Sequence, residues 1–261
     1  MEFAPVMSRL GKIAGLALGI WTFAPCAEAQ SVAEHLSLGD VAYGQRHPKE
    51  ALDHYLKGIA VDSMNYEARW KASRAEVDLA EAASKGAEMD SLMAAAQRNA
   101  EAAVRIRGND PEGHFSLARA IGRKALSVGT MERIRFAKIV RAEALDALKY
   151  DSTHAGALHV LGMWNAEIMR VNGLARAFAK TFLGAQVFSL ANWDEAQRLL
   201  AAAVSHDPTR IVHKLDLAGI YADRGDKTKA KQLYEWIGTA PVIDSNDDLY
   251  KKQAAERLKK L

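Results

Sequence analysis

The same spacing of small and aromatic residues occurs near both ends of this 261-residue chain, in segments 38–55 and 217–234. Each segment begins with Leu and a small residue, and Ala and Tyr follow 12 and 16 residues after the small one (Leu38-Gly39, Ala51, Tyr55; Leu217-Ala218, Ala230, Tyr234). This pattern is typical of tetratricopeptide repeats, in which each unit of roughly 34 residues is a pair of antiparallel helices. The sequence therefore predicts an all-α, tetratricopeptide-like superhelix of helix pairs, with about four to five repeats and a C-terminal capping helix.

A third copy of the pattern is interrupted. It begins at Leu161-Gly162, and its second half, at 196–203, comes only after an insertion at 171–191. Small residues at the Leu-Gly and Ala positions let the two helices of a pair approach closely. We therefore expect the helices on either side of the insertion to pack together as one repeat.

Helix ends are predicted where Asp follows an apolar helix and Pro or Ser comes next, since Pro cannot continue a helix. Such ends occur at Asp62-Ser63, Asp110-Pro111 and Asp207-Pro208, and more weakly at Asp151-Ser152. No stretch alternates with period two over more than a few residues, so no sheet is expected. The helices are expected near 32–46, 49–61, 65–84, 88–107, 112–127, 131–149, 154–170, 174–188, 193–205, 210–224, 227–238 and 246–260.

The composition agrees with a helical globular protein. Alanine, the best helix former, supplies 48 of the residues, and 49% of the chain is hydrophobic. A disordered chain would have few apolar residues and a large net charge, whereas this chain has a formal charge of +3. The same small charge gives no reason to expect a concentrated basic surface, so no nucleic-acid partner is expected.

The first 29 residues are typical of a signal peptide. Arg9 and Lys12 precede an apolar run at 13–24, and a small-residue cleavage site ends at Ala29. Cleavage there would leave 30–261 as a single repeat domain, periplasmic or secreted, without a transmembrane segment, because the apolar run is shorter than the roughly 20 residues of a spanning helix. Two alternatives remain, an uncleaved anchor and a lipoprotein modified at Cys26, which Pro25 directly before it disfavours.

Chemistry-bearing motifs are missing from the sequence. It has no Gly-rich phosphate loop, no His-Glu-x-x-His, no Gly-x-Ser-x-Gly and no pair of cysteines. His54 with Glu50 and Asp53 would suit a metal, but a solvated helix surface explains them as well. Carboxylates such as Glu76 and Asp78 are expected at caps or on the surface. We predict no enzyme, no cofactor and no metal.

A binding site is expected on the concave face, which the first helix of each repeat lines. The repeat register places Leu36, Asp40, Tyr43, Trp70, Arg74, Val77, His159, Met163, Trp164, Glu167, Leu215 and Gly219 on or beside that face. Trp70 and Arg74 are four residues apart on one helix face, and an aromatic wall with a fixed guanidinium suits a carboxylate, a phosphate headgroup or a peptide terminus. The alternative is that Trp70 packs between helices while Arg74 pairs with Glu67 or Asp78.

The insertion at 171–191 is more apolar than its position in a repeat protein requires. Phe178 and Phe182 are four residues apart, and Leu174, Leu183 and Phe188 add to the apolar content. Three interpretations remain open: a helix that closes over the groove, additional core, or a membrane-surface contact. The last needs a fuller basic face than Arg176 and Lys180 supply.

Several segments resemble the regulator of microtubule dynamics family of tetratricopeptide proteins. The resemblance covers roughly residues 35–261, and its most specific part is His-x-Leu-Gly-x-Trp at 159–164 followed by the insertion. The other matching segments are 67–75 (Glu-Ala-Arg-Trp-Lys-Ala-Ser-Arg-Ala), 177–183 (Ala-Phe-Ala-Lys-Thr-Phe-Leu), 193–196 (Trp-Asp-Glu-Ala) and 215–221 (Leu-Asp-Leu-Ala-Gly-Ile-Tyr).

This resemblance implies an all-helical, non-enzymatic domain. Eukaryotic members of the family are associated with microtubules, spindle poles and mitochondria, and one type at membrane contact sites binds phospholipid in its groove. The predicted export signal departs from those members and disfavours a microtubule role here. Two function hypotheses follow: an exported bacterial-type scaffold that binds a protein or peptide in its concave groove, and a carrier that holds a lipid or another small amphiphile under the 171–191 helix.

Overall fold

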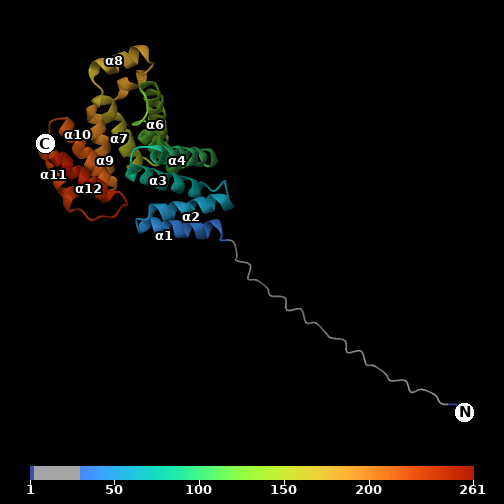
Figure 1. Cartoon of the computed structure of the whole chain (residues 1–261). Helices are drawn as coiled ribbons and strands as arrows, with labels where there is room; N and C mark the ends of the chain where they lie inside the picture. Colours follow the sequence, from blue (N-terminus) through green and yellow to red (C-terminus); the bar gives the residue numbers. More distant parts are fainter. Residues whose placement is uncertain (3–29) are drawn as a thin grey trace. The chain divides into compact units, whose positions relative to one another are not determined.

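Pairs of antiparallel helices make up the part of the chain that the computed structural model describes, which is Met1, Glu2 and 30–261 (Figure 1). Residues 31–261 form one compact unit. The predicted signal peptide and Cys26 lie outside the described residues, so export stays a prediction.

Twelve α-helices and one short 3-10 helix occur in 30–261, without any strand, which confirms the predicted fold class. Eleven of the twelve expected helices lie within three residues of their expected bounds. The helices are α1 (Val32–Gly44), α2 (Pro48–Val61), α3 (Tyr66–Ala82), α4 (Ala87–Ile106), α5 (Pro111–Lys124), α6 (Thr130–Tyr150), α7 (Ala155–Arg170), α8 (Gly173–Phe182), α9 (Trp193–His206), α10 (Ile211–Asp223), α11 (Lys227–Thr239) and α12 (Asp247–Leu258), with the 3-10 helix η1 (Gln186–Leu190).

Small residues allow the close packing within each pair, as the repeat pattern predicts. A Cβ atom at Gly39 would overlap the fully buried ring of Tyr55, the aromatic residue of the same repeat. In the interrupted repeat, a Cβ at Gly162 would lie 3.0 Å from Leu200 and 3.2 Å from the Ala196 carbonyl oxygen. The pair α7 and α9 is therefore one repeat, and α8 with η1 is an insertion between its two halves.

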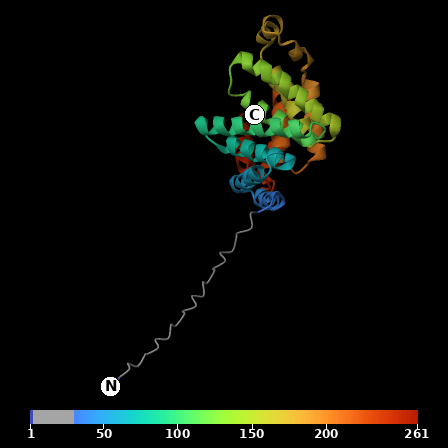
Figure 2. The same ribbon diagram turned by 90° about the vertical axis from the view of Figure 1, so that its right-hand side faces the viewer.

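The insertion differs from the single helix expected at 174–188. Helix α8 ends at Phe182, Gly184 has a positive φ of 65°, and the chain continues as η1. Gly184 adopts this left-handed backbone without steric cost, which lets the chain turn and bring Phe188 into the core beside Trp164 and Ile168. Figure 2 shows α8, in gold, at the end of the described unit opposite to α1, in blue.

The Asp residues at the four predicted helix ends cap different helix termini. Asp62, Asp151 and Asp207 cap the C-termini of α2, α6 and α9 as expected, but Asp110 caps the N-terminus of α5. Its carboxylate accepts a hydrogen bond from the Glu112 amide, and Pro111 fills the first helical position, where its missing N–H costs nothing.

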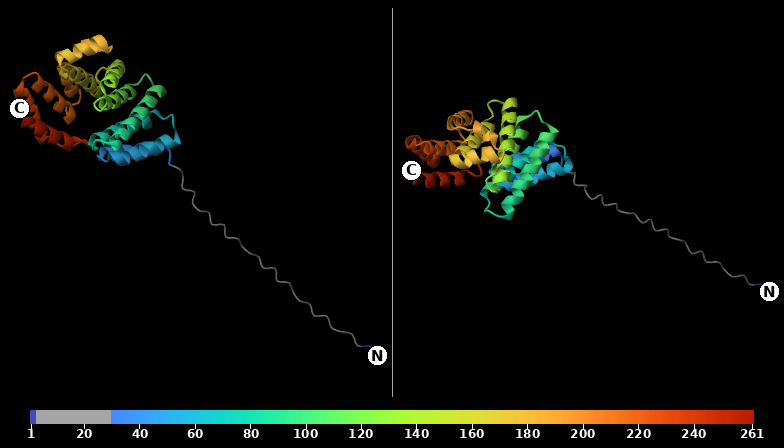
Figure 3. Two further views of the ribbon diagram at one scale, coloured as in Figure 1. Left: turned by 45° about the horizontal axis from the view of Figure 1, so that its top comes forward. Right: turned by 90° about the horizontal axis from the view of Figure 1, so that it is seen from above.

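The last helix returns to the second repeat. Tyr250 of α12 donates a hydrogen bond to Glu81 of α3 at 2.5 Å, and the Asn246 amide donates to the Asp78 carbonyl oxygen at 3.0 Å. Figure 3 shows the C-terminal helices, in red, reaching the blue-green helices of the N-terminal half. These contacts between residues almost 170 positions apart close the superhelix on one side. No helix in the described part of the chain is both long and apolar enough to cross a membrane.

Candidate functional site

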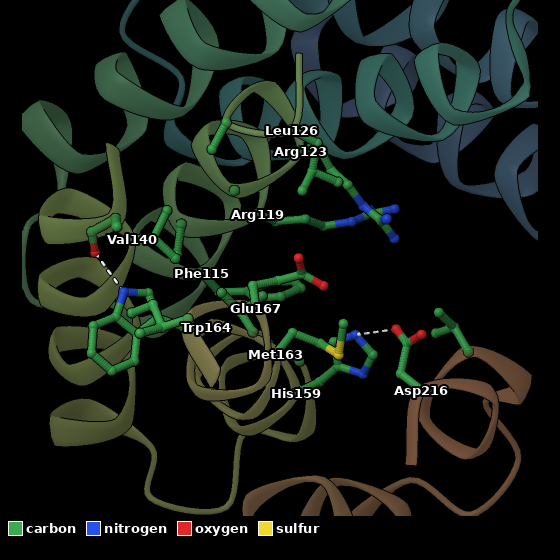
Figure 4. A pocket seen from close by; sticks show the side chains of 18 of the residues that line it. Phe115, Arg119, Arg123, Leu126, Val140, His159, Met163, Trp164, Glu167 and Asp216 are labelled. Carbon is green, nitrogen blue, oxygen red and sulfur yellow. Dashed lines mark hydrogen bonds and ion pairs between the residues drawn. The ribbon is translucent and has the colours of Figure 1, made fainter. Parts of the chain in front are cut away.

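A groove of about 1270 Å³ lies on the inner side of the superhelix. Helices α3, α5, α7 and α10, the first helices of four repeats, contribute to it, together with α6, the insertion and the segment before α12. Figure 4 shows its two walls, with Trp164, Val140 and Phe115 on one side and the Arg119 and Arg123 guanidinium groups on the other.

The apolar wall is well packed behind its surface. Trp164 is buried against Phe136, Ile168 and Phe188, and its indole N–H donates a hydrogen bond to the Ala137 carbonyl oxygen at 2.7 Å. This bond satisfies the only polar atom of the side chain and fixes the ring in place. The wall therefore presents a rigid apolar surface to a ligand.

The charged wall is a network of ion pairs between α3 and α5. Arg119 lies 2.6 Å from Asp78 and 3.1 Å from Glu81, and Arg123 lies 2.9 Å from Glu81. Burial alone would raise the pKa of the Glu81 carboxyl, but the charges of Arg123 and Arg119 outweigh burial and lower it. The Glu81 carboxylate therefore keeps its charge at neutral pH, and the paired side chains form a charged wall of the groove.

A second polar cluster joins α7 to α10. His159 and His213 lie with their Nδ1 atoms 2.8 Å apart, and His159 Nε2 lies 3.3 Å from Asp216 (Figure 4). Burial lowers the pKa of His213 to about 2, with the His159 ring adding to the effect. Burial would raise the pKa of Asp216, but its hydrogen bond and charge interaction with His159 lower it to about 2.

The region of Trp70 and Arg74 lies at the same groove. The Arg74 guanidinium carbon is 3.7 Å from the centre of the Tyr43 ring and 5.1 Å from the Trp70 ring. The alternative that Arg74 pairs with Glu67 or Asp78 is wrong, because Glu67 pairs with Lys71 at 2.5 Å and Asp78 pairs with Arg119.

Most of the expected groove residues line it. Seven do so: Trp70, Arg74, His159, Met163, Trp164, Glu167 and Phe178. Tyr43 lies behind Arg74 instead of at the groove surface, and the side chain of Phe182 lies outside the described part of the chain. Three other residues expected on the concave face pack in apolar clusters away from the groove instead: Leu36, Val77 and Leu215.

Sequence reasoning missed the charged wall. Arg119 and Arg123 are four residues apart on α5, the first helix of the third repeat, and the same register argument that found Trp70 and Arg74 would have found them. The two acids expected at the surface, Glu76 and Asp78, are instead buried. Their partners, Asn99 on α4 and Arg119 on α5, lie more than 20 residues away in sequence, so no local pattern reveals them.

The insertion leaves an apolar surface toward the groove. Leu174, Ala175, Phe178 and Ala179 of α8 line it, and Leu174 and Phe178 are 88% and 55% exposed. Helix α8 lines the groove, while Ala185 and Phe188 belong to a core cluster, so part of the insertion is additional core.

Comparisons with known proteins give a family and a fold. The family described as regulator of microtubule dynamics protein 1-3 matches residues 36–261. A thermophilic tetratricopeptide protein of Thermus thermophilus, TTC0263, is similar in structure with a TM-score of 0.63 and 17% identity over 86% of this chain and 99% of its own. PilF of Pseudomonas aeruginosa has a TM-score of 0.52 and 9% identity over 87% of this chain and 84% of its own. These two similarities support the fold alone, and a comparison with curated protein sequences finds no significant match.

Proposed function

The chain belongs to the regulator of microtubule dynamics family, and from this membership and its groove we propose that it is a non-enzymatic binding protein that holds a segment of a partner protein. The observation that carries the proposal is one groove with a rigid apolar wall and a wall of fixed charges. An extended polypeptide can contact both walls, because it carries apolar side chains on a polar backbone.

The size and polarity of the groove favour a polypeptide over a metabolite. Small-molecule pockets occupy about 300–1,000 Å³, and this groove is larger at about 1270 Å³. Arg119, Arg123 and Asn246 place donors along one wall, where they can bind backbone carbonyl oxygens or acidic side chains. A purely apolar ligand could not form hydrogen bonds with these three side chains.

The exposed apolar face of α8 supports a second candidate, a carrier for a lipid or another amphiphile. Leu174 and Phe178 face the groove and would be covered by an acyl chain lying beneath the helix. The charged wall would then hold the headgroup. The two candidates differ in whether the groove retains peptides or aliphatic chains.

We also propose that the protein is exported, on the pattern of the sequence at 9–29, which lies outside the described residues. Mass spectrometry of the protein recovered from the periplasm or medium tests this proposal: a chain that begins at Gln30 supports cleaved export, and absence of the protein from both fractions contradicts export. The microtubule role that the family name implies does not suit an exported protein, so we do not propose it.

A library of random 12-residue peptides tests the binding function. The immobilised 30–261 chain is expected to retain a subset of the library. Met163→Trp places a larger side chain in the groove and should abolish retention, whereas Met64→Trp, at an exposed position away from the groove, should leave it unchanged.

Equal retention by all three proteins, or none by the wild type, would contradict peptide binding in the groove. Native mass spectrometry after incubation with dodecanoate and with phosphatidylcholine vesicles examines the second candidate. An acyl-chain adduct that Met163→Trp loses, together with no retained peptide, would favour the carrier.

A further inference from the structure

We infer that Arg74, which lies against Tyr43 and near Trp70, binds a carboxylate of the partner segment in the groove. This inference rests on the proposed function, because the carboxylate belongs to a polypeptide whose apolar side chains lie on the opposite wall. Arg74 is then the residue of the groove that binds the negatively charged group of the partner.

Arg74 differs from Arg119 and Arg123 of the charged wall in its lack of a carboxylate. Arg119 and Arg123 are both within 3.1 Å of an acid, whereas no acid of the described residues lies within 4.0 Å of Arg74. Its one hydrogen bond, from Nη2 to the Tyr55 hydroxyl, is long at 3.4 Å, and its Nε is buried without a partner. Most of its five N–H donors are therefore unused.

The neighbouring acids are committed to other groups. Asp40 lies 2.6 Å from Lys71 and accepts a hydrogen bond from Tyr55 at 2.9 Å. Asp78 accepts a hydrogen bond from Tyr43 at 2.6 Å and pairs with Arg119 at the same distance. A rotation of Arg74 toward either acid would compete with contacts that already exist, so the unused Nη donors stay available to a ligand.

The neighbouring Tyr43 and Trp70 rings fix the position of Arg74. The Tyr43 ring centre lies 3.7 Å from the guanidinium carbon, and the Tyr43 hydroxyl is itself held by Asp78. Stacking of this kind immobilises the planar group before a ligand arrives and reduces the entropy lost on binding. A guanidinium fixed in this way matches the two oxygens of a carboxylate with two parallel hydrogen bonds.

Trp70 supplies the adjoining surface. It lines the groove one helical turn before Arg74, so the residue that carries the carboxylate can lie against the indole ring. The carboxylate has two sources in a polypeptide, the chain terminus and the side chains of Asp and Glu. Both present the same chemistry to Arg74, and the experiment separates them.

Three random peptide libraries test the inference: one without Asp and Glu and with a free C-terminal acid, its C-terminally amidated counterpart, and an amidated library that contains Asp and Glu. The wild-type 30–261 chain is expected to retain one of the two acid-bearing libraries at least tenfold better than the amidated library without acids. A preference for the first assigns the terminus, and a preference for the third assigns a side chain.

Arg74→Gln should remove this preference while keeping retention through the apolar wall. Arg74→Lys keeps the charge but not the planar fork, and should restore only part of the preference. Arg105→Gln, an exposed arginine of α4 outside the groove, is the matched control and should behave as the wild type.

Equal retention of all three libraries by the wild type would overturn the inference while leaving the peptide-binding function intact. A preference that persists in Arg74→Gln, with helix content unchanged by circular dichroism, would overturn it too. Loss of all retention by the wild type is a failure of the proposed function itself.

Discussion

At the scale of single residues, the buried carboxyl of Glu76 gives the clearest electrostatic test of the structure. Both its oxygens accept from the Asn99 side-chain amide at 3.0 Å, and no cation among residues 30–261 lies within ion-pair distance. Burial raises its pKa to about 7, against smaller opposing effects of Asn99, Arg98 and Arg69. The folded protein therefore keeps a proton that the unfolded chain releases at lower pH.

We predict that Glu76→Gln stabilises the protein at pH 8 and has little effect at pH 4.5. Because the pKa is raised in the folded state, stability falls as pH rises from the unfolded value near 4.5 to about 7. The amide has the same shape, keeps one hydrogen bond with Asn99 and does not ionise. Urea unfolding at the two pH values should show a gain of about 2–3 kcal/mol at pH 8 only. An equal effect at both pH values would contradict the buried, protonated carboxyl.

The sequence predicts individual groove residues where the repeat pattern gives their positions on a helix. Trp70, Arg74, His159 and Met163 line the groove because helix periodicity fixes which side chains share a face. The partners of Arg119 and the burial of Glu76 were not predictable, since each depends on a contact with a different helix. The unpaired state of Arg74 follows from those same contacts and not from its own helix.

At the scale of helices, glycine has opposite effects at two positions. Gly39 of α1 faces the buried Tyr55 ring with no space for a Cβ, whereas a Cβ at Gly122 of α5 would meet Val140 at an ordinary 3.8 Å. We predict that Gly39→Ala destabilises the protein by about 1–3 kcal/mol through overpacking. Gly122→Ala should stabilise it by about 0.5–1 kcal/mol, because Gly is a poor helix residue.

Urea unfolding midpoints of the two variants measure this difference. The opposite signs are the test, since both substitutions improve helix propensity by the same amount. If Gly39→Ala is as stable as the wild type, the close approach of α1 and α2 at the repeat position is wrong.

The inserted segment contains a buried residue, Phe188, and an exposed residue that lines the groove, Leu174. Phe188 is buried among Trp164 and Ile168, so Phe188→Ala should cost about 3–5 kcal/mol. Leu174 is 88% exposed, so Leu174→Ala should change stability by less than about 0.5 kcal/mol. It should instead weaken retention of groove ligands. Thermal unfolding and peptide retention separate the two effects, and a large loss of stability in Leu174→Ala would mean that α8 is core.

Helix positions were predicted well because apolar periodicity and capping are local properties. The one helix that differed, at 174–188, ends early where Gly184 adopts a positive φ. Whether a Gly uses its conformational freedom depends on what the next residues pack against. Here Phe188 packs into the core, which the sequence pattern alone did not show.

At the scale of the whole molecule, the return of α12 to α3 closes the superhelix around the groove. We predict that Tyr250→Phe, which removes the hydrogen bond to Glu81, loosens this closure. Amide hydrogen exchange should become faster across α12 while exchange in α5 and α6 stays the same. A hydrogen bond to a charged group contributes about 1.5–3 kcal/mol. The loss in Tyr250→Phe should be smaller, because Arg119 and Arg123 keep the Glu81 carboxylate paired.

The matched control is Tyr221→Phe on α10, whose hydroxyl makes no hydrogen bond with the described residues. Unchanged exchange in α12 of Tyr250→Phe would show that the contact does not hold the closure. Nothing in the sequence predicted this closure, because it joins residues 169 positions apart through side chains that look like ordinary surface groups.

The central claim is that the groove binds a segment of a partner protein, and site-specific cross-linking tests it most directly. Benzoylphenylalanine is placed at Val160, which lines the groove, and separately at Leu56, which is exposed elsewhere, and each protein is irradiated with the random 12-residue peptides. Mass spectrometry is predicted to find peptide adducts at position 160 and none above background at position 56. Adducts at both positions alike, or at neither, would contradict the claim.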